Sequence, residues 1–242
     1  NKKILSNWEF NAWAKYKNYK KDNKAYLKIK KAIKIDVIKP KFKNRKIVLE
    51  GGSIDVNGNG LLMTTKQCLA SKIQERNKGF KTKDYEKIFK KFLGVNKIIW
   101  LNNGIEGDDT HGHIDDIARF VNKDKIFIAK ESNKQEKNFK NLNENIEILK
   151  KFKNENQKKL KIIQIPMPKP KKINGVRVPA SYLNFYIANR IVLVPTFKDP
   201  KDKIVLKIFK RHFKSREIIP VDCSVLVWGF GTIHCLTQQE PI

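Results

Sequence analysis

Short apolar runs alternate with stretches of helical periodicity along the whole chain of 242 residues. The runs have the length of strands and are too short for buried helices. The predicted strands span residues 46–49, 53–56, 61–64, 97–101, 126–129, 161–165, 185–188, 191–194, 217–221 and 232–237. Strands that alternate with helices in this way favour the α/β class.

Three stretches between these runs repeat apolar residues on one helical face. Residues 85–92 and 142–152 follow an i, i+3, i+4, i+7 spacing, and residues 204–213 suggest a less regular third helix. The run Asn57-Gly58-Asn59-Gly60 is typical of a hairpin turn. Because no G-x-G-x-x-G turn is present, mixed strand pairing is favoured over a doubly wound sheet. No flexible linker divides the chain, so we expect a single domain over residues 1–242.

The net charge of +28 invites a nucleic-acid interpretation. However, only seven of the 52 basic residues are arginines, whose planar fork reads bases and phosphates best. The lysines are also spread from Lys2 to Lys214 instead of gathering in one arm. We therefore expect no specific nucleic-acid partner and keep a basic binding protein as an alternative. No apolar run is long enough to span a membrane, so no membrane partner is expected either.

Three cysteines without a C-x-x-C pair fit a reducing compartment better than a disulfide framework. No secretory signal pattern opens the sequence, and the expected location is the cytoplasm. Cys68 and Cys223 are interpreted as buried packing residues, because that is what most free cysteines are. Cys235 differs in its surroundings, with glycines before it and hydroxyl and amide side chains just after it.

The segment 107–116 is dense in titratable groups. His113 and Asp115 are two residues apart, so on an extended backbone their side chains share a face, where an imidazole can transfer protons beside a carboxylate that binds a cation. One alternative is a polar loop that caps a helix at residues 117–120. Another is a metal site formed by His111, His113 and a carboxylate, but the spacing is not typical of such a site and no metal is expected.

Two glycine-containing segments complete the set of candidate site residues. Gly231 precedes Cys235 and lets the backbone approach a ligand closely. On the strand predicted at 232–237, His234 would point away from Cys235 and is a poor candidate for its base. Glu50 comes before Gly51 and Gly52, where it either ends a strand in a tight turn or orients a histidine as a buried carboxylate.

Taken together, five segments resemble the agmatine deiminase family of guanidino-group-modifying enzymes. The segments are Trp8-Glu9-Phe10-Asn11-Ala12-Trp13, Glu50-Gly51-Gly52-Ser53, Gly107-Asp108-Asp109-Thr110-His111-Gly112-His113-Ile114-Asp115, Pro179-Ala180-Ser181-Tyr182-Leu183-Asn184-Phe185-Tyr186 and Ile233-His234-Cys235-Leu236-Thr237-Gln238-Gln239. Each motif is weak alone, but five in the family's order are specific and run nearly from end to end of the chain.

The resemblance implies a five-bladed α/β propeller of ββαβ-type blades and the hydrolysis of a guanidine to a urea with loss of ammonia. It implies Cys235 as the nucleophile, His113 as general acid and base, Asp115 as the guanidinium carboxylate and Glu50 as the partner of His113. It further implies that Asp109, Asn184 and Gly231 contact the substrate. A thiolate is a strong nucleophile near neutral pH without a metal, so no cofactor is expected.

The expected substrate is a small cationic guanidine, with agmatine first and free or peptidyl arginine as alternatives. Members of this family carry an Arg-Asp motif before the tryptophan-containing stretch, and none precedes Trp8 here. We therefore expect a chain that lacks the N-terminal part of the fold, and an inactive remnant of such an enzyme is a second interpretation. The sequence leaves a homo-oligomeric state open.

Overall fold

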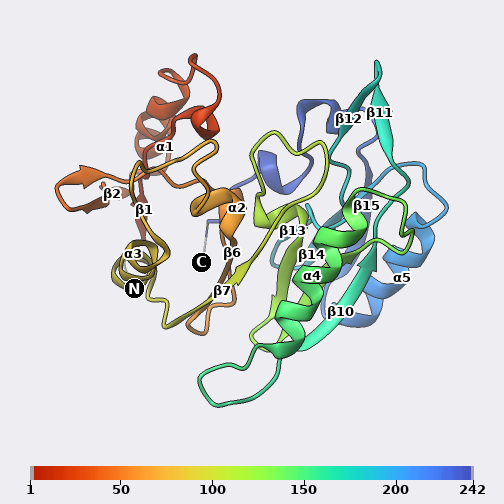
Figure 1. The fold of residues 1–242 in the computed structure, drawn as a ribbon. Coiled ribbons are helices and arrows are strands. Elements are labelled where there is room, and N and C mark those ends of the chain that lie inside the picture. Colours follow the sequence, from red (N-terminus) through yellow and green to blue (C-terminus); the bar gives the residue numbers. More distant parts are fainter. Residues whose placement is uncertain (1–2, 241–242) are drawn as a thin grey trace.

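Three copies of a ββαβ module build most of the computed structural model, which describes residues 3–240 (Figure 1). In each module an antiparallel strand pair leads into a helix, and the strand after the helix runs parallel to the second strand of the pair. Module 1 comprises β5 (Asp55–Val56), β6 (Leu61–Thr65), α3 (Thr82–Leu93) and β7 (Lys97–Leu101). Module 2 comprises β8 (Ala118–Asn122), β9 (Lys125–Lys130), α4 (Asn138–Lys151) and β10 (Lys161–Pro166). Module 3 comprises β13 (Tyr186–Ile187), β14 (Ile191–Thr196), α5 (Asp202–His212) and β15 (Glu217–Asp222).

The remaining elements are short. Before module 1, the parallel strands β1 (Ile4–Ser6) and β2 (Asp36–Ile38) flank α1 (Ala25–Ile33). Two hairpins are formed by β3 (Lys41–Phe42) with β4 (Arg45–Lys46), and by β11 (Lys171–Ile173) with β12 (Val176–Val178). The helix α2 (Lys66–Leu69) follows β6 directly, and short 3₁₀ turns include η3 (Gly51–Ser53), η4 (Ile114–Asp116), η5 (Leu226–Gly229) and η6 (His234–Leu236).

Local sequence accounts for the limits of module 1. The Asn57 side chain accepts hydrogen bonds from the backbone N–H groups of Asn59 and Leu61, which closes the predicted turn between β5 and β6. Helix α3 buries Tyr85, Ile88 and Phe89, the face that the periodicity predicts. It ends at Gly94, whose φ of 63° is left-handed and therefore suits a residue without a side chain.

The core consists of two apolar clusters. A smaller one lies under α3 in module 1, and a larger one joins modules 2 and 3. At the centre of the larger cluster the rings of Phe127 and Phe185 lie 4.9 Å and 5.0 Å from the ring of Phe209, in edge-to-face contacts. This packing fixes module 3 against module 2 and thereby sets the relative positions of the loops that follow their strands.

The sequence predictions of an α/β class, of mixed strand pairing and of three helices are confirmed. Three local expectations differ from the structure. The strand expected at 46–49 is reduced to the end of β4 at Lys46 and an isolated bridge at Val48. The helix at 117–120, one of the alternatives for this loop, does not form, because β8 (Ala118–Asn122) pairs with β9. Residues 232–237 contain the turn η6 instead of a strand, because Asn184 binds the backbone N–H groups of Thr232, His234 and Cys235 that a sheet would need.

In the described residues, every sheet is an open one of two or three strands. Over the same part of the chain, none of the helices combines the length and the apolar composition that crossing a bilayer requires. Segments that connect the modules line one cavity, and the C-terminal turn η6 contacts η3, which precedes module 1. The fold therefore gathers loops from distant parts of the sequence at one place.

Candidate active site

The loops between modules surround a cavity of about 1000 Å³. Its walls come from residues within 49–56, 109–120 and 226–239, together with Ile187 and with Phe10 and Trp13 near the N-terminus. The four residues predicted to be catalytic all line this cavity: Glu50, His113, Asp115 and Cys235. They are separated by up to 185 positions in the chain, so only the module packing brings them together.

Asp108 shapes the loop that presents His113. Its carboxylate accepts hydrogen bonds from the backbone N–H of Gly112 at 2.7 Å and of His113 at 3.1 Å, and it also binds Thr110. Gly107 and Gly112 both have φ of 90°, a conformation that side chains disfavour. Hydrogen bonds within the loop therefore fix its conformation, which places His113 and Asp115 at the cavity wall.

Glu50 connects an arginine to the predicted general acid. One carboxylate oxygen accepts a hydrogen bond from Nε of Arg76 at 3.0 Å, and the other lies 3.6 Å from Nε2 of His113. The Arg76 guanidinium, whose side chain is completely buried, also donates to the carbonyl oxygens of Gln74 and Thr110. The sequence missed Arg76, because it lies in a loop with no motif around it.

These contacts determine the protonation of His113. Burial lowers its pKa, but the carboxylates of Glu50 and Asp115 raise it by more, so the pKa of His113 is raised overall. Burial opposes the ionisation of Glu50, yet His113 and Arg76 outweigh this effect and lower the pKa of Glu50. Both shifts favour a protonated His113 imidazole beside an ionised Glu50 carboxylate.

We expect Glu50→Gln to move the alkaline limb of the rate profile to lower pH. A general acid works only while protonated, and the loss of the Glu50 charge lowers the pKa of His113, so activity disappears earlier as the pH rises. Turnover should fall by roughly 10–100-fold, part of what acid–base catalysis contributes. The measurement is kcat against pH. An unchanged profile with a lower rate would indicate that Glu50 only supports the structure.

Asn184 holds Cys235 from behind. Its Nδ2 donates to the Cys235 sulfur at 3.0 Å and to Asp116 at 3.1 Å, while its Oδ1 accepts from the backbone N–H groups of Thr232 and Cys235. Asn184 is almost completely buried and lies under the thiol instead of on the cavity wall. Gly231 does line the cavity, and a Cβ there would come within 2.8 Å of the Cys235 sulfur. Both residues thus determine where the thiol points.

Two adjacent buried carboxyl groups beside Cys235 differ in pKa. Burial opposes the ionisation of Asp115, but His234, His113 and Arg119 lower its pKa overall. Burial and the charge of Asp115 raise the pKa of Asp116 well above its usual range. Asp115 therefore ionises before Asp116.

His234 lies at the site, contrary to the expectation from a strand. In the turn η6 its Nδ1 comes within 2.8 Å of Oδ2 of Asp115, and the same oxygen lies 3.6 Å from the Cys235 sulfur. The other oxygen of Asp115 is buried and has no hydrogen-bond partner in the described residues. Burial, followed by the charges of Asp115 and Asp116, raises the pKa of the Cys235 thiol.

A matched pair of glycines tests how tightly the site is packed. A Cβ on Gly52 would lie 2.6 Å from Nδ1 of His113 and 2.9 Å from Oδ2 of Asp115, whereas a Cβ on Gly51 would meet only Gln238 at 3.6 Å. We expect Gly52→Ala to lower kcat/KM by about 100-fold, because both catalytic groups must move. Gly51→Ala is the control and should stay within about threefold. Equal effects of the two substitutions on steady-state rates would contradict this packing argument.

Asp109 lies at the outer wall of the cavity. Its carboxylate accepts a hydrogen bond from the Tyr16 hydroxyl at 2.8 Å and lies 3.8 Å from Nζ of Lys15. His111 is not part of the catalytic group, since its Nε2 faces the Ser71 hydroxyl at 3.3 Å. Within the described residues, the metal set of His111, His113 and a carboxylate does not come together.

Comparison with known proteins places the chain in a family. The family model described as Porphyromonas-type peptidyl-arginine deiminase matches residues 1–241. The agmatine deiminase of Pseudomonas aeruginosa (strain LESB58) is 30% identical over 257 aligned residues, which cover 97% of this chain and 68% of that protein. A Legionella pneumophila (strain Paris) protein assigned as an agmatine deiminase is 36% identical over 196 residues, 81% of this chain.

A cysteine-to-serine variant of the C. jejuni agmatine deiminase, solved with substrate bound, superposes with a TM-score of 0.85 and 31% identity. The match covers 97% of this chain and 66% of that one. The chain spans only 56% of the length of the Legionella relative. On the family match and these relatives, the chain belongs to the Porphyromonas-type peptidyl-arginine deiminase family.

Proposed function

We propose that the protein is an agmatine deiminase-like hydrolase, which converts the guanidine of agmatine to a urea and releases ammonia through a covalent intermediate on Cys235. The observation that carries the proposal is the unpartnered, buried oxygen of Asp115 at the cavity that also holds the thiol. A guanidinium N–H donates well to such an oxygen. A cation bound to Asp115 would bring its central carbon close to the Cys235 sulfur, since that sulfur lies 3.6 Å from the same carboxylate.

The first half of the reaction forms a carbon–sulfur bond. Binding of the cationic guanidinium partly neutralises the carboxylate field that raises the pKa of Cys235, so the thiol gives up its proton to water in the cavity. The thiolate attacks the guanidinium carbon, and Asn184 keeps the sulfur in place. His113 donates a proton to one nitrogen of the tetrahedral adduct. Ammonia leaves, and an amidino-thioether remains on Cys235.

The second half returns the enzyme to its starting state. The neutral imidazole of His113 takes a proton from a water molecule, and the resulting hydroxide attacks the amidino carbon. The carbon–sulfur bond breaks, which frees the thiolate and the urea product. Glu50 stabilises the imidazolium in each protonated stage. Water and the guanidine supply every atom, so we propose that no cofactor or metal takes part in catalysis.

Charge along the cavity favours agmatine over free arginine. Arg119 is the arginine among the described lining residues. Its Nε donates to Asp55 at 2.9 Å, its Nη1 donates to the carbonyls of Leu183 and Phe185, and its side chain is 4% exposed. It is thus committed and not free to bind a substrate carboxylate. The outer wall presents Asp109 instead, which suits an amine, and the Phe10 and Trp13 side chains suit an alkyl chain. Asp109 is accordingly proposed to contact the substrate tail.

We further propose that residues 1–242 form one catalytic domain of a five-bladed α/β propeller. The three ββαβ modules supply three blades, and β1, α1 and β2 supply part of another.

The cysteine pattern favours the cytoplasm, and the product N-carbamoylputrescine would serve putrescine and polyamine synthesis. The partner is the small guanidine rather than nucleic acid or membrane, and a homo-oligomer is compatible with the proposal.

Ammonia release from agmatine, arginine and a peptidyl-arginine substrate tests the proposal. We expect agmatine to be the preferred substrate and N-carbamoylputrescine to accumulate in equal amount to ammonia. Preference for arginine or peptidyl arginine would redirect the substrate assignment. Labelling of Cys235 by a haloacetamidine without any turnover would support an inactive remnant. If the protein shows no turnover and Cys235 is not labelled, the proposed guanidine site is refuted.

A further inference from the structure

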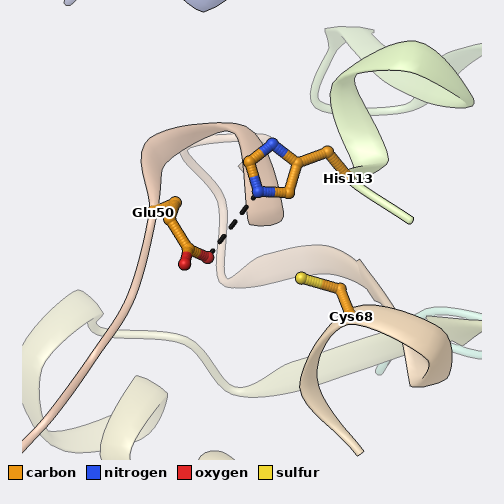
Figure 2. Close-up of side chains that lie close together, drawn as sticks. All are labelled: Glu50, Cys68 and His113. Atoms are coloured by element: carbon orange, nitrogen blue, oxygen red, sulfur yellow. Dashed lines mark ion pairs between the residues drawn. The ribbon is translucent and has the colours of Figure 1, made fainter. Parts of the chain in front are cut away.

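A second thiol lies behind the imidazole of His113. Cys68 belongs to α2 and is 1% exposed, and it takes no part in the proposed reaction. Figure 2 shows its sulfur directed toward the same side of the His113 ring that faces Glu50. One ligand atom of each of these three residues lies within 4.8 Å of the other two. Among residues 3–240, this is the one group of three or more His, Cys, Asp or Glu side chains whose ligand atoms all lie this close together.

Two polar atoms of this group are buried and have no hydrogen-bond partner among residues 3–240. They are Oε2 of Glu50 and Nε2 of His113, in side chains that are 5% and 6% exposed. Their separation of 3.6 Å is too long for a good hydrogen bond and suits a shared third partner. Buried polar atoms are normally satisfied, so an arrangement that leaves both open indicates a ligand between them.

We propose that Glu50, Cys68 and His113 form a site for a thiophilic divalent cation of the Zn²⁺ class. Carboxylate oxygen, thiolate sulfur and imidazole nitrogen are three ligands that Zn²⁺ accepts in tetrahedral geometry. Binding breaks the S–H bond of Cys68 and the Nε2–H bond of the His113 imidazolium, and both protons are released to water. Zn²⁺ then bonds the sulfur, Nε2 of His113 and Oε2 of Glu50, and the imidazole keeps a single proton on Nδ1.

The distances and charges around the group suit such an ion. Ligands bound to Zn²⁺ at about 2.0–2.3 Å lie roughly 3.3–3.8 Å apart in a tetrahedron, so side-chain movements of about 1 Å complete the site. The charges of Cys68 and Glu50 balance the ion. Arg76 stays bonded to the other oxygen of Glu50, and Asp108 and Asp115 add negative charge nearby. Glu50 and His113 line the cavity, which gives the ion access and a water molecule as fourth ligand.

The surrounding structure holds the three ligands in place before any ion arrives. Thr65 accepts a hydrogen bond from the backbone N–H of Cys68 at 3.0 Å and donates to the carbonyl of Gly112 at 2.6 Å. One side chain therefore fastens the helix of Cys68 to the loop of His113. A site arranged in this way loses little freedom when it binds an ion.

Occupation of the site would inhibit the enzyme. A metal on Nε2 prevents formation of the imidazolium and separates His113 from Glu50, so no proton remains for the departing ammonia. This consequence rests on the proposed function, but the binding itself does not. The ion would act as a reversible inhibitor that leaves the Cys235 thiol free.

Binding can be measured without any turnover by titrating Cys235→Ser with Zn²⁺ and with Co²⁺ as a coloured substitute. We expect about one ion per chain and a sulfur-to-cobalt charge-transfer band. Adding Cys68→Ser, which keeps the size of the side chain, should remove the band and weaken binding at least about 100-fold. Adding Cys223→Ala, a second buried cysteine, is the control and should preserve both signals. Thermal unfolding checks that each variant is folded.

The alternatives give different outcomes. Titration of the wild-type protein completes the series. A cobalt band that is present in the wild-type protein, lost in Cys235→Ser and retained in the Cys68→Ser single variant would place the ion at the nucleophile and overturn the proposal, as would the absence of binding. If the band behaves as expected but no guanidine is turned over, the metal site stands and the proposed function fails. If the protein is active, the Zn²⁺ concentration that halves its rate should be at least about 100-fold higher for the Cys68→Ser variant than for the protein with Cys68. Each rate is taken relative to the zinc-free rate of the same protein.

Discussion

Replacement of Cys235 by serine should abolish turnover and leave the fold intact. The thiolate is the protein nucleophile of the proposed reaction, and a serine hydroxyl in its place stays protonated beside Asp115 and Asp116. We expect kcat to fall by at least about 10⁴-fold. Asn184 can donate to the new oxygen as it does to the sulfur, so the unfolding temperature should shift by only about 2–4 °C. Ammonia release and thermal unfolding measure the two effects.

Chemical labelling adds specificity to this test. A haloacetamidine resembles the guanidinium and should modify Cys235 alone, because Cys235 lines the cavity while Cys68 and Cys223 are buried. Mass spectrometry of peptides from the labelled protein identifies the modified residue. Modification of Cys68 in place of Cys235 would contradict the assignment of the nucleophile, as would a Cys235→Ser variant that retains turnover.

The sequence predicted those parts of the fold that depend on local periodicity. The helix at residues 82–93 shows a clear apolar face and the turn at 57–60 has an unambiguous hairpin composition, so both follow from short-range physics. The strand expected at 232–237 failed for a long-range reason. Its backbone donors are bound by Asn184, which lies about fifty residues earlier and which no periodicity connects to it.

The site divides in the same way. Glu50, His113, Asp115 and Cys235 were found because each belongs to a recognisable motif, and the structure brings them to one cavity. Arg76 and Asp116 were missed, because their importance comes from burial and from partners that only the fold supplies. His234 was placed on the wrong side, because a 3₁₀ turn directs successive side chains differently from a strand.

Asp115→Asn should lower turnover while it makes the thiol more reactive. The substitution removes the carboxylate proposed to bind the guanidinium, so kcat/KM should fall by about 10²–10³-fold. It also removes a negative charge that raises the pKa of Cys235 and is the largest cause of this shift after burial. The pKa of the thiol therefore decreases, more thiolate is present at neutral pH, and alkylation by iodoacetamide should become faster. Steady-state rates and alkylation rates against pH measure the two effects.

Slower turnover together with faster alkylation distinguishes a substrate-binding role of Asp115 from a purely structural one. General damage to the site would slow both reactions or expose all three thiols, whereas loss of one charge slows turnover and moves the alkylation profile of Cys235 to lower pH. Asp109→Asn is the matched control, since Asp109 is a carboxylate on the same cavity and is bonded to Tyr16, away from the thiol. It should leave the alkylation profile unchanged. An unchanged profile in Asp115→Asn would instead mean that the Asp115 carboxylate does not act on the sulfur, and the proposed activation of Cys235 by a bound cation would lose its basis.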